Sequence, residues 1–432
     1  MDTLLLRAMK LKQALLDYID SAEGELAIAL ERYSAEQLAQ PTKFQFQGQA
    51  RTDWMINRFL TEAQISGKTP IACFLEKISE LTDGDRALVR SWENSFIGLF
   101  EVTEPLATGF TGINWLTGQP YQIQVPPEQM PTQLGQKEIL LSRIAPLDKD
   151  WMVFGPQMRL GKLGKPKLAV AIGHFKHDFP THLYGDAPDL LEAAWQSVEQ
   201  YHEEFVDFFG QDQVTLPGEQ MGQQLQELQA AIVQKRMNAV EQQPEISEAE
   251  FLERVDTVGL DPQTAKRLFR QKSPLDRLTE PAVSLPDHLK QAATLTLLVH
   301  PRWGQVFLAD YCQLLGYLKE TNAEETAAAR ALLQTYLTNP EVKPFVWQRL
   351  AQEYPVSLET LLRSILNRPG WQLKQDLPSL LQEFHHSPEP ALPETASVPL
   401  HLHQLFETAL LEVQKQKKKP KGKATATKGF GR

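Results

Sequence analysis

The sequence has very little cysteine and no long apolar run. Its 432 residues include two cysteines, Cys73 and Cys312, which lie far apart and in apolar surroundings. Two such residues cannot build a disulfide framework or a zinc motif, so we expect buried free thiols and a reducing compartment. No stretch approaches the roughly 20 apolar residues that a membrane-spanning helix needs, and the leucine-rich start lacks the cleavage pattern of a secretory signal. The sequence therefore predicts a cytoplasmic protein without a transmembrane segment.

The common catalytic motifs are absent as well. The chain contains no Gly-x-Ser-x-Gly elbow, no Gly-x-Gly-x-x-Gly fingerprint, no kinase motif set and no Cys-x-x-Cys pair. These motifs place a nucleophile on a tight turn, or bring backbone amides close to phosphates, so their absence removes the common hydrolase and nucleotide-binding classes. It leaves open an enzyme built on another arrangement. We expect no cofactor and favour a protein without catalytic activity.

Charge is distributed unevenly along the chain. The net charge is −10, yet residues 413–432 carry eight basic residues and no acid. The other 412 residues therefore carry a net charge of −18. An acidic body repels polyanions, whereas a basic tail attracts RNA or anionic lipid without regard to sequence. The tail residues expected to make such a contact are Lys417, Lys418, Lys419, Lys421 and Lys423.

Hydrophobic periodicity predicts an α+β protein that is mostly α-helical. N-terminal helices precede a small antiparallel β-sheet or barrel, and a C-terminal helical bundle precedes a disordered basic tail. In the middle region, short segments rich in β-branched and aromatic residues run from 96 to 173, and Tyr121, Ile123 and Val125 alternate after a turn, which indicates a hairpin. We expect seven consecutive regions: N-terminal helices (1–92), a β module (93–175), helices packing on that module (176–280), a C-terminal helical domain (281–386), a proline-rich linker (387–399), a short helix (400–413) and the basic tail (414–432).

Histidines gather in one short segment after the last expected strand. His174, His177, Asp178 and His182 fall within nine residues, and neutral imidazoles with a carboxylate suit zinc or another transition metal. The spacing matches no established ligand pattern, and a strand-to-helix loop with partly exposed histidines is the more common arrangement. The segment is nevertheless the candidate metal site, with a general acid–base role for one histidine as a further possibility.

Two other segments are basic. Arg159, Lys162, Lys165 and Lys167 surround two glycines, which lets backbone amides approach an anion. A basic hairpin tip is the plain interpretation, and contact with a polyanion is the functional one. Residues 251–272 read as helix, turn and helix with a cationic second helix. Ordinary helix packing is the common explanation of such a pattern, and a nucleic-acid-binding regulator is the functional one.

Part of the chain resembles a known group of proteins. The segments TDWMINRFLTEAQISGKTPIACFLE, DRALVRSWENSFIGLFEV, NWLTGQPYQIQV and LLSRIAPLDKDWMVFGPQ are similar to uncharacterised bacterial proteins that are common in cyanobacteria and have plastid relatives. The resemblance covers roughly residues 50–160 and consists of packing residues. It implies a helical lead-in to a small β module, and it transfers no catalytic or zinc-binding position.

These observations favour a non-enzymatic cytoplasmic interaction or assembly factor. Helical surfaces would hold a protein partner, and the basic tail would add a second, weaker contact with RNA, the ribosome or an anionic membrane. A metal-dependent enzyme or metal binder at residues 174–182 is the first alternative. A nucleic-acid-binding regulator that uses residues 251–272 is the second.

Overall fold

The chain forms two compact units. The computed structural model describes residues 3–39, 42–130, 133–242, 278–279, 285–319 and 327–418. The first unit contains the residues up to Pro188 together with those from Pro399 onward, and the second contains Asp189–Val398. The predicted α+β class with a helical majority is confirmed, since helices come first, a β-barrel follows and helices dominate the C-terminal half.

Five helices and a short 3-10 turn open the first unit. Their bounds are Thr3–Asp20 (α1), Glu25–Ala39 (α2), Gln49–Glu62 (α3), Pro70–Lys77 (α4), Asp83–Ser91 (α5) and Trp92–Asn94 (η1). Thr69 begins α4 by accepting a hydrogen bond from the backbone of Ala72, and Thr82 begins α5 in the same way, because the first N–H groups of a helix have no partner within it. The buried faces of these helices meet in one core beside the barrel.

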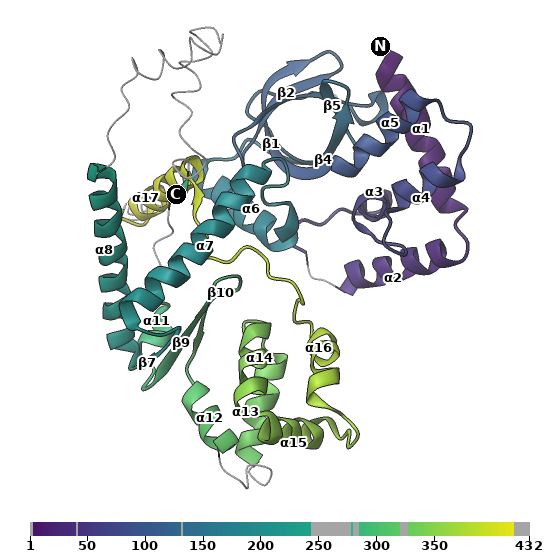
Figure 1. The fold of residues 1–432 in the computed structure, drawn as a ribbon. Helices are drawn as coiled ribbons and strands as arrows, with labels where there is room; N and C mark the ends of the chain where they lie inside the picture. Colours follow the sequence, from purple (N-terminus) through teal and green to yellow (C-terminus); the bar gives the residue numbers. More distant parts are fainter. Residues whose placement is uncertain are drawn as a thin grey trace, which may run out of the picture. The chain divides into compact units, whose positions relative to one another are not determined.

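The expected small β module is a closed barrel. Its strands are Phe96–Leu106 (β1), Gly109–Asn114 (β2), Pro120–Gln124 (β3), Ile139–Leu147 (β4), Asp150–Val153 (β5) and Met158–Gly161 (β6), with a 3-10 turn at Pro127–Gln129 (η2). The order is β1-β2-β3-β5-β4, and β4 also pairs with β1, so the five strands close a ring that Figure 1 shows end on. Only β3 and β5 pair in parallel, and β6 extends the sheet beside β4. Buried side chains such as Phe100, Phe110 and Leu140 fill the interior.

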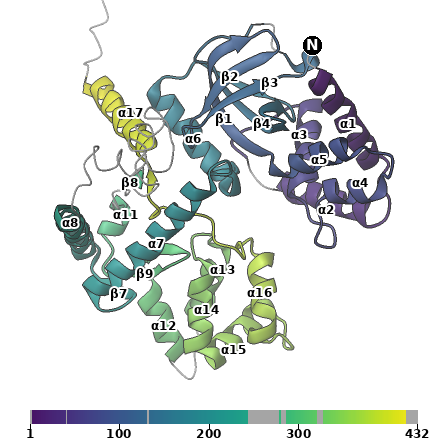
Figure 2. The ribbon, with the colours of Figure 1, turned by 45° about the horizontal axis from the view of Figure 1, so that its top comes forward.

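Two further helices complete the first unit. Lys165–Asp178 forms α6, Pro180–His182 forms a 3-10 turn (η3), and Leu400–Lys418 forms α17, which packs on α6 (Figure 2). The prediction of a strand at residues 167–173 is therefore wrong, because these residues lie within α6. Pro166 stands in the first turn of α6, and the buried residues Leu168, Ala171 and Phe175 recur at helical spacing. The short C-terminal helix exists and is five residues longer than expected.

The second unit combines a three-stranded sheet with helices. Its elements are Pro188–Phe209 (α7), Gln213–Leu216 (β7), Gly218–Gln242 (α8), Leu278–Thr279 (β8), Asp287–Lys290 (α11), Leu295–His300 (β9), Gly304–Leu308 (β10), Tyr311–Lys319 (α12), Ala327–Thr338 (α13), Pro344–Glu353 (α14), Pro355–Leu366 (α15), Leu373–Glu383 (α16) and Val398–Pro399 (β11). The sheet has the order β10-β9-β7 and is antiparallel throughout. The sequence predicts helices alone between 281 and 386. That prediction is wrong for the hairpin of β9 and β10.

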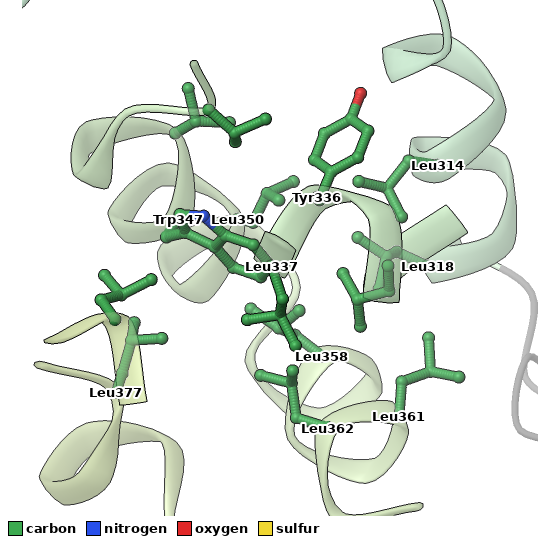
Figure 3. Packing of buried hydrophobic residues seen from close by; sticks show 14 of the residues in the cluster. Leu314, Leu318, Tyr336, Leu337, Trp347, Leu350, Leu358, Leu361, Leu362 and Leu377 are labelled. Carbon is green, nitrogen blue, oxygen red and sulfur yellow. The ribbon is translucent and has the colours of Figure 1, made fainter. Parts of the chain in front are cut away.

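Helices cover both faces of this sheet. Leu295, Leu297 and Val299 of β9 pack into a core with α7 and α8, whereas Leu298 faces a second core with α12–α16. Figure 3 shows the centre of that second core around Trp347 and Leu337, which are fully buried. Because β9 is the central strand and is buried on both faces, its sequence is almost continuously apolar.

Two smaller expectations can be compared with the structure. Cys312 is exposed and Cys73 is half-buried, so the expectation of buried thiols is wrong for Cys312. It follows Tyr311 in the first turn of α12, and the tyrosine takes the buried position. Of residues 387–399, expected as a linker, those up to Val398 belong to the second unit, and Leu392 and Ala396 are buried. No helix in the described part of the chain is long and apolar enough to cross a membrane.

Candidate functional site

The histidine segment predicted from the sequence lies at the end of α6 and in the turn η3. The imidazole of His174 meets the ring of Phe44 edge-on, with 6.1 Å between ring centroids. His177 Nδ1 lies 2.8 Å from a carboxylate oxygen of Asp178. His182 Nε2 lies 3.1 Å from the carboxylate of Glu62 in α3. Two of these three contacts, those of His174 and His182, join the segment to neighbouring structure, and the third lies within it.

The four proposed metal ligands do not form one ligand set. The Asp178 carboxylate accepts hydrogen bonds from the backbone N–H groups of Lys43 and Phe44, both at 2.7 Å. His182 is instead engaged with Glu62. Across the described ranges, no group of three or more histidine, cysteine or acidic side chains is placed to hold a metal ion. The predicted metal site is thus not assembled, because its carboxylate already anchors a loop and one of its imidazoles is held by another carboxylate.

A buried ionic cluster centres on Glu62. Its carboxylate pairs with Arg58 at 2.8 Å and with Arg143, and it accepts a hydrogen bond from the Tyr33 hydroxyl at 2.9 Å. Arg143, which comes from β4 and is 1% exposed, also donates to the hydroxyls of Thr61 and Ser95. One carboxylate therefore holds two guanidinium groups between α3 and the barrel.

Burial and neighbouring charges set the protonation of this cluster. Burial by itself would raise the pKa of Glu62, but Arg143, the hydrogen bond with His182 and Arg58 outweigh it and hold that pKa well below its ordinary value. Burial, reinforced by the two arginines, lowers the pKa of His182 despite its contact with Glu62. His182 is therefore neutral at pH 7, and the cluster keeps one net positive charge.

A pocket of about 520 Å³ opens beside this cluster. The end of α2, the loop 42–46, the first half of α3 and Phe179 form its walls. Asp178 fixes the loop, because it holds the backbone of Lys43 and Phe44. The volume lies within the range of small-ligand pockets, which are typically lined by aromatic side chains and a few polar groups.

Four aromatic rings of the pocket wall contact one another. Phe46 stacks on Trp54 with centroids 4.5 Å apart and an interplanar angle of 25°. Trp54 meets Phe179 edge-on at 5.9 Å, and Phe44 stacks on Phe179 at 6.2 Å. The guanidinium of Arg58 lies 5.5 Å from the centre of the Phe179 ring, within the range of a cation–π contact. Phe44, Trp54 and Phe179 are buried and Phe46 is half-buried, so the rings form one packed cluster, and Phe46 is its most accessible member.

The charged residues of the pocket wall are both arginines. Arg58 is held by Glu62, and its Nη1 also donates to Gln37 Oε1 at 2.8 Å. Arg51, in the first turn of α3, is exposed, and its side chain pairs with no other residue that the structure describes. No acidic side chain joins them in the wall. With two cations and four aromatic rings in its wall, this pocket suits an anionic, partly aromatic group.

None of the residues that line this pocket was predicted as a site residue from the sequence. The signal for it is the polar stretch FQFQGQARTDW (44–54), in which two phenylalanines alternate with glutamines before an arginine. Phe44 and Trp54 are themselves buried, and their packing against Phe46 and Phe179 depends on contacts that the sequence pattern does not indicate.

The predicted polyanion-binding residues lie elsewhere. Arg159 in β6 pairs with Glu138 at 2.7 Å. Lys162 is exposed just before α6, and Lys165 and Lys167 are exposed in its first turn. Lys417 and Lys418 end α17. Lys419, Lys421, Lys423 and the expected helix-turn-helix at 251–272 lie outside the described residues. Contact with a polyanion therefore stays a prediction.

Comparison with known proteins adds no identity. No family model, no curated protein and no solved structure matches the chain. The resemblance expected for residues 50–160 is therefore neither supported nor contradicted, and function must be inferred from the site itself.

Proposed function

We propose that this protein is a non-enzymatic interaction factor whose first unit receives a side chain of a partner protein in the aromatic pocket. The observation that carries the proposal is the wall of Phe44, Phe46, Trp54 and Phe179 with Arg51 at its edge. Aromatic residues and arginine are the types most enriched at the energetic centres of protein interfaces. Asp178, Glu62 and His182 each have a structural partner, which favours binding over catalysis.

Site-specific cross-linking tests this proposal. A photoreactive phenylalanine analogue replaces Leu38, which is 56% exposed and lines the pocket. The matched control replaces Ile28, which lies on the same helix α2, is 66% exposed and does not line the pocket. After irradiation in cells and nuclease treatment, mass spectrometry should identify a protein joined at residue 38 and not at residue 28.

The Phe46→Ser substitution completes the test. Phe46 is half-buried on a loop, so its ring can be removed without opening the core. The adduct at residue 38 should disappear in this variant. A yield at residue 38 no higher than at residue 28, or an adduct that survives Phe46→Ser, would contradict the proposal.

The basic tail adds a second contact in this proposal. Five cations lie beyond the last described helix, in residues 419–432. A variant in which glutamine replaces all five keeps the length of the chain and removes the charge. Its affinity for single-stranded RNA should fall at low salt, and the slope of log affinity against log salt should flatten by about 0.7 for each lost phosphate contact. An unchanged slope would remove the tail from the proposal.

A further inference from the structure

We infer that the aromatic pocket selects a peptide segment in which an aromatic residue is flanked by glutamate or aspartate. This inference rests on the proposed function and names the kind of segment that the partner presents. Three features of the pocket carry it: the ring array, the arginine at the edge and the two glutamine side chains.

The ring array accepts one more ring. The aromatic contacts of the wall span centroid distances from 4.5 to 6.2 Å and include stacked and edge-on geometries. Aromatic pairs prefer these separations and arrangements. An incoming phenylalanine or tyrosine continues the array against Phe46 and Trp54, whereas an aliphatic side chain fills the space without the ring contacts.

Arg51 selects the acidic neighbour of that ring. Its guanidinium is always charged and offers a planar pair of donors that matches a carboxylate. Arg58 cannot serve in its place, because Glu62 and Gln37 already accept from it. With no acid in the pocket wall, a carboxylate beside the bound ring pairs with Arg51 and is not repelled by a second negative charge in that wall.

Two glutamines suit the main chain of a peptide. Gln37 uses its carbonyl oxygen to accept from Arg58, which leaves its NH₂ group to donate. Gln45 donates its NH₂ group to the backbone carbonyl of Thr42 at 3.3 Å, which leaves its oxygen to accept. One free donor and one free acceptor match the carbonyl and N–H groups of a peptide unit.

The charge balance favours a peptide over a nucleic acid at this site. Outside the last 20 residues the chain carries a net charge of −18, which repels a chain of phosphates. A single carboxylate brings one charge and meets one uncommitted arginine. A nucleotide remains the rival ligand that an experiment must compare, since a base can also stack on Phe46 and Trp54.

Calorimetric titration of the full-length protein with four probes tests the inference. The probes are the capped tripeptides acetyl-Glu-Phe-Glu-amide, acetyl-Gln-Phe-Gln-amide and acetyl-Glu-Ala-Glu-amide, together with adenosine monophosphate. Because glutamate stands on both sides of the phenylalanine, the result does not depend on the direction in which the peptide lies in the pocket. The Glu-Phe-Glu peptide should bind at least about tenfold more tightly than the Gln-Phe-Gln peptide, because a charge-assisted pair is lost. The Glu-Ala-Glu peptide should not bind measurably.

Substitution of Arg51 locates the selectivity. Arg51→Gln should bring the affinity for Glu-Phe-Glu down to that for Gln-Phe-Gln. The matched control is Arg90→Gln, which removes an exposed arginine of the same unit that does not line this pocket. This control should keep the preference for the acidic peptide.

The possible failures are distinguishable. Equal affinity for the acidic and the amide peptide, a preference that survives Arg51→Gln, or binding of adenosine monophosphate alone would each overturn the inference. If both phenylalanine peptides bind equally and Phe46→Ser abolishes both, the acidic selectivity is wrong and the proposed function stands. If the cross-link at residue 38 fails as well, both are wrong.

Discussion

The carboxylate of Asp178 accepts a hydrogen bond of 2.7 Å from the backbone N–H of Phe44, a residue 134 positions earlier in the chain. The same carboxylate holds the N–H of Lys43. The end of α6 therefore fixes the loop that carries two of the four pocket rings. A residue that the sequence suggested as a metal ligand therefore positions a loop of the pocket wall.

Replacing Asp178 by asparagine should loosen this loop. The amide keeps one acceptor oxygen and loses the charge, and weakening hydrogen bonds to a charged acceptor costs about 1–3 kcal/mol. Hydrogen exchange at residues 43–46 should accelerate, while exchange in the barrel strands β1 and β4 stays slow. Asp20→Asn, at the exposed end of α1, is the control and should leave exchange unchanged both at residues 43–46 and in β1 and β4. Unchanged exchange at 43–46 in the Asp178 variant would contradict the anchoring role.

Replacing Glu62 by glutamine should strongly destabilise the first unit. The substitution leaves Arg58 and Arg143 without their shared carboxylate, and removing one partner of a buried ion pair typically costs about 3–5 kcal/mol. Combining it with Arg143→Met should recover part of this loss, since the uncompensated charge is then removed as well. Urea unfolding followed by hydrogen exchange of β1 and β4 measures both effects. A loss no larger than that of the exposed control Glu36→Gln would refute this account.

Acidification should destabilise the first unit in two stages. Burial lowers the pKa of His182 below its ordinary value of 6.5, so below that pH the unfolded chain binds a proton that the folded chain does not. Stability therefore falls as the pH drops through and below about 6.5. The pKa of Glu62 is held well below its ordinary value of 4.5, chiefly by Arg143 acting against burial, so its contribution is present above 4.5 and is lost at lower pH.

A histidine variant isolates the first stage. Burial also lowers the pKa of His401 in the same unit, so the comparison must be between the wild type and His182→Gln. The variant should show a shallower loss of unfolding free energy between pH 7 and pH 5. His288→Gln removes an exposed histidine and should leave the slope of the wild type unchanged. An identical slope in the His182 variant would show that this imidazole is not the group responsible.

Two glycine substitutions should have opposite signs. A Cβ atom on Gly109 of β2 would lie 1.9 Å from the backbone oxygen of Ile123 in β3, so Gly109→Ala must push these strands apart. Gly173 in α6 has open space at the same position. There alanine should stabilise the helix by about 0.5–1 kcal/mol, because glycine has more backbone freedom to lose. Thermal unfolding of both variants checks this, and a stabilising Gly109→Ala would refute the strand contact.

The fold class was predictable because periodicity reports burial. Apolar residues alternate with polar ones in the strand that carries Tyr121 and Ile123, and the helices show clear apolar stripes. The errors fall where local pattern is ambiguous. Residues 167–173 are apolar enough for a strand, and only Pro166 and the spacing of Leu168, Ala171 and Phe175 favour the helix that forms. In β9 a run that is buried on both faces resembles part of a buried helix.

The candidate site was less predictable because it depends on long-range contacts. The composition of residues 174–182 indicated a site, and Phe179 within this segment does line the pocket. The contacts that Asp178 and His182 make, however, are with residues far away in the sequence. Asp178 meets residues 43 and 44, and His182 meets Glu62. Nothing in the spacing of 174–182 indicates these partners. The pocket residues themselves belong to a polar segment whose two phenylalanines have meaning only once α3 and Phe179 lie beside them.

The return of the chain to its first unit has a consequence for biosynthesis. Helix α17 packs on α6, and its His401 imidazole lies 2.8 Å from the backbone oxygen of Trp115 next to the barrel. About two hundred residues of the second unit are translated between these partners. The unit whose synthesis begins first is thus completed last, and a chain that ends between residues 188 and 399 leaves the α17-binding face of α6 uncovered.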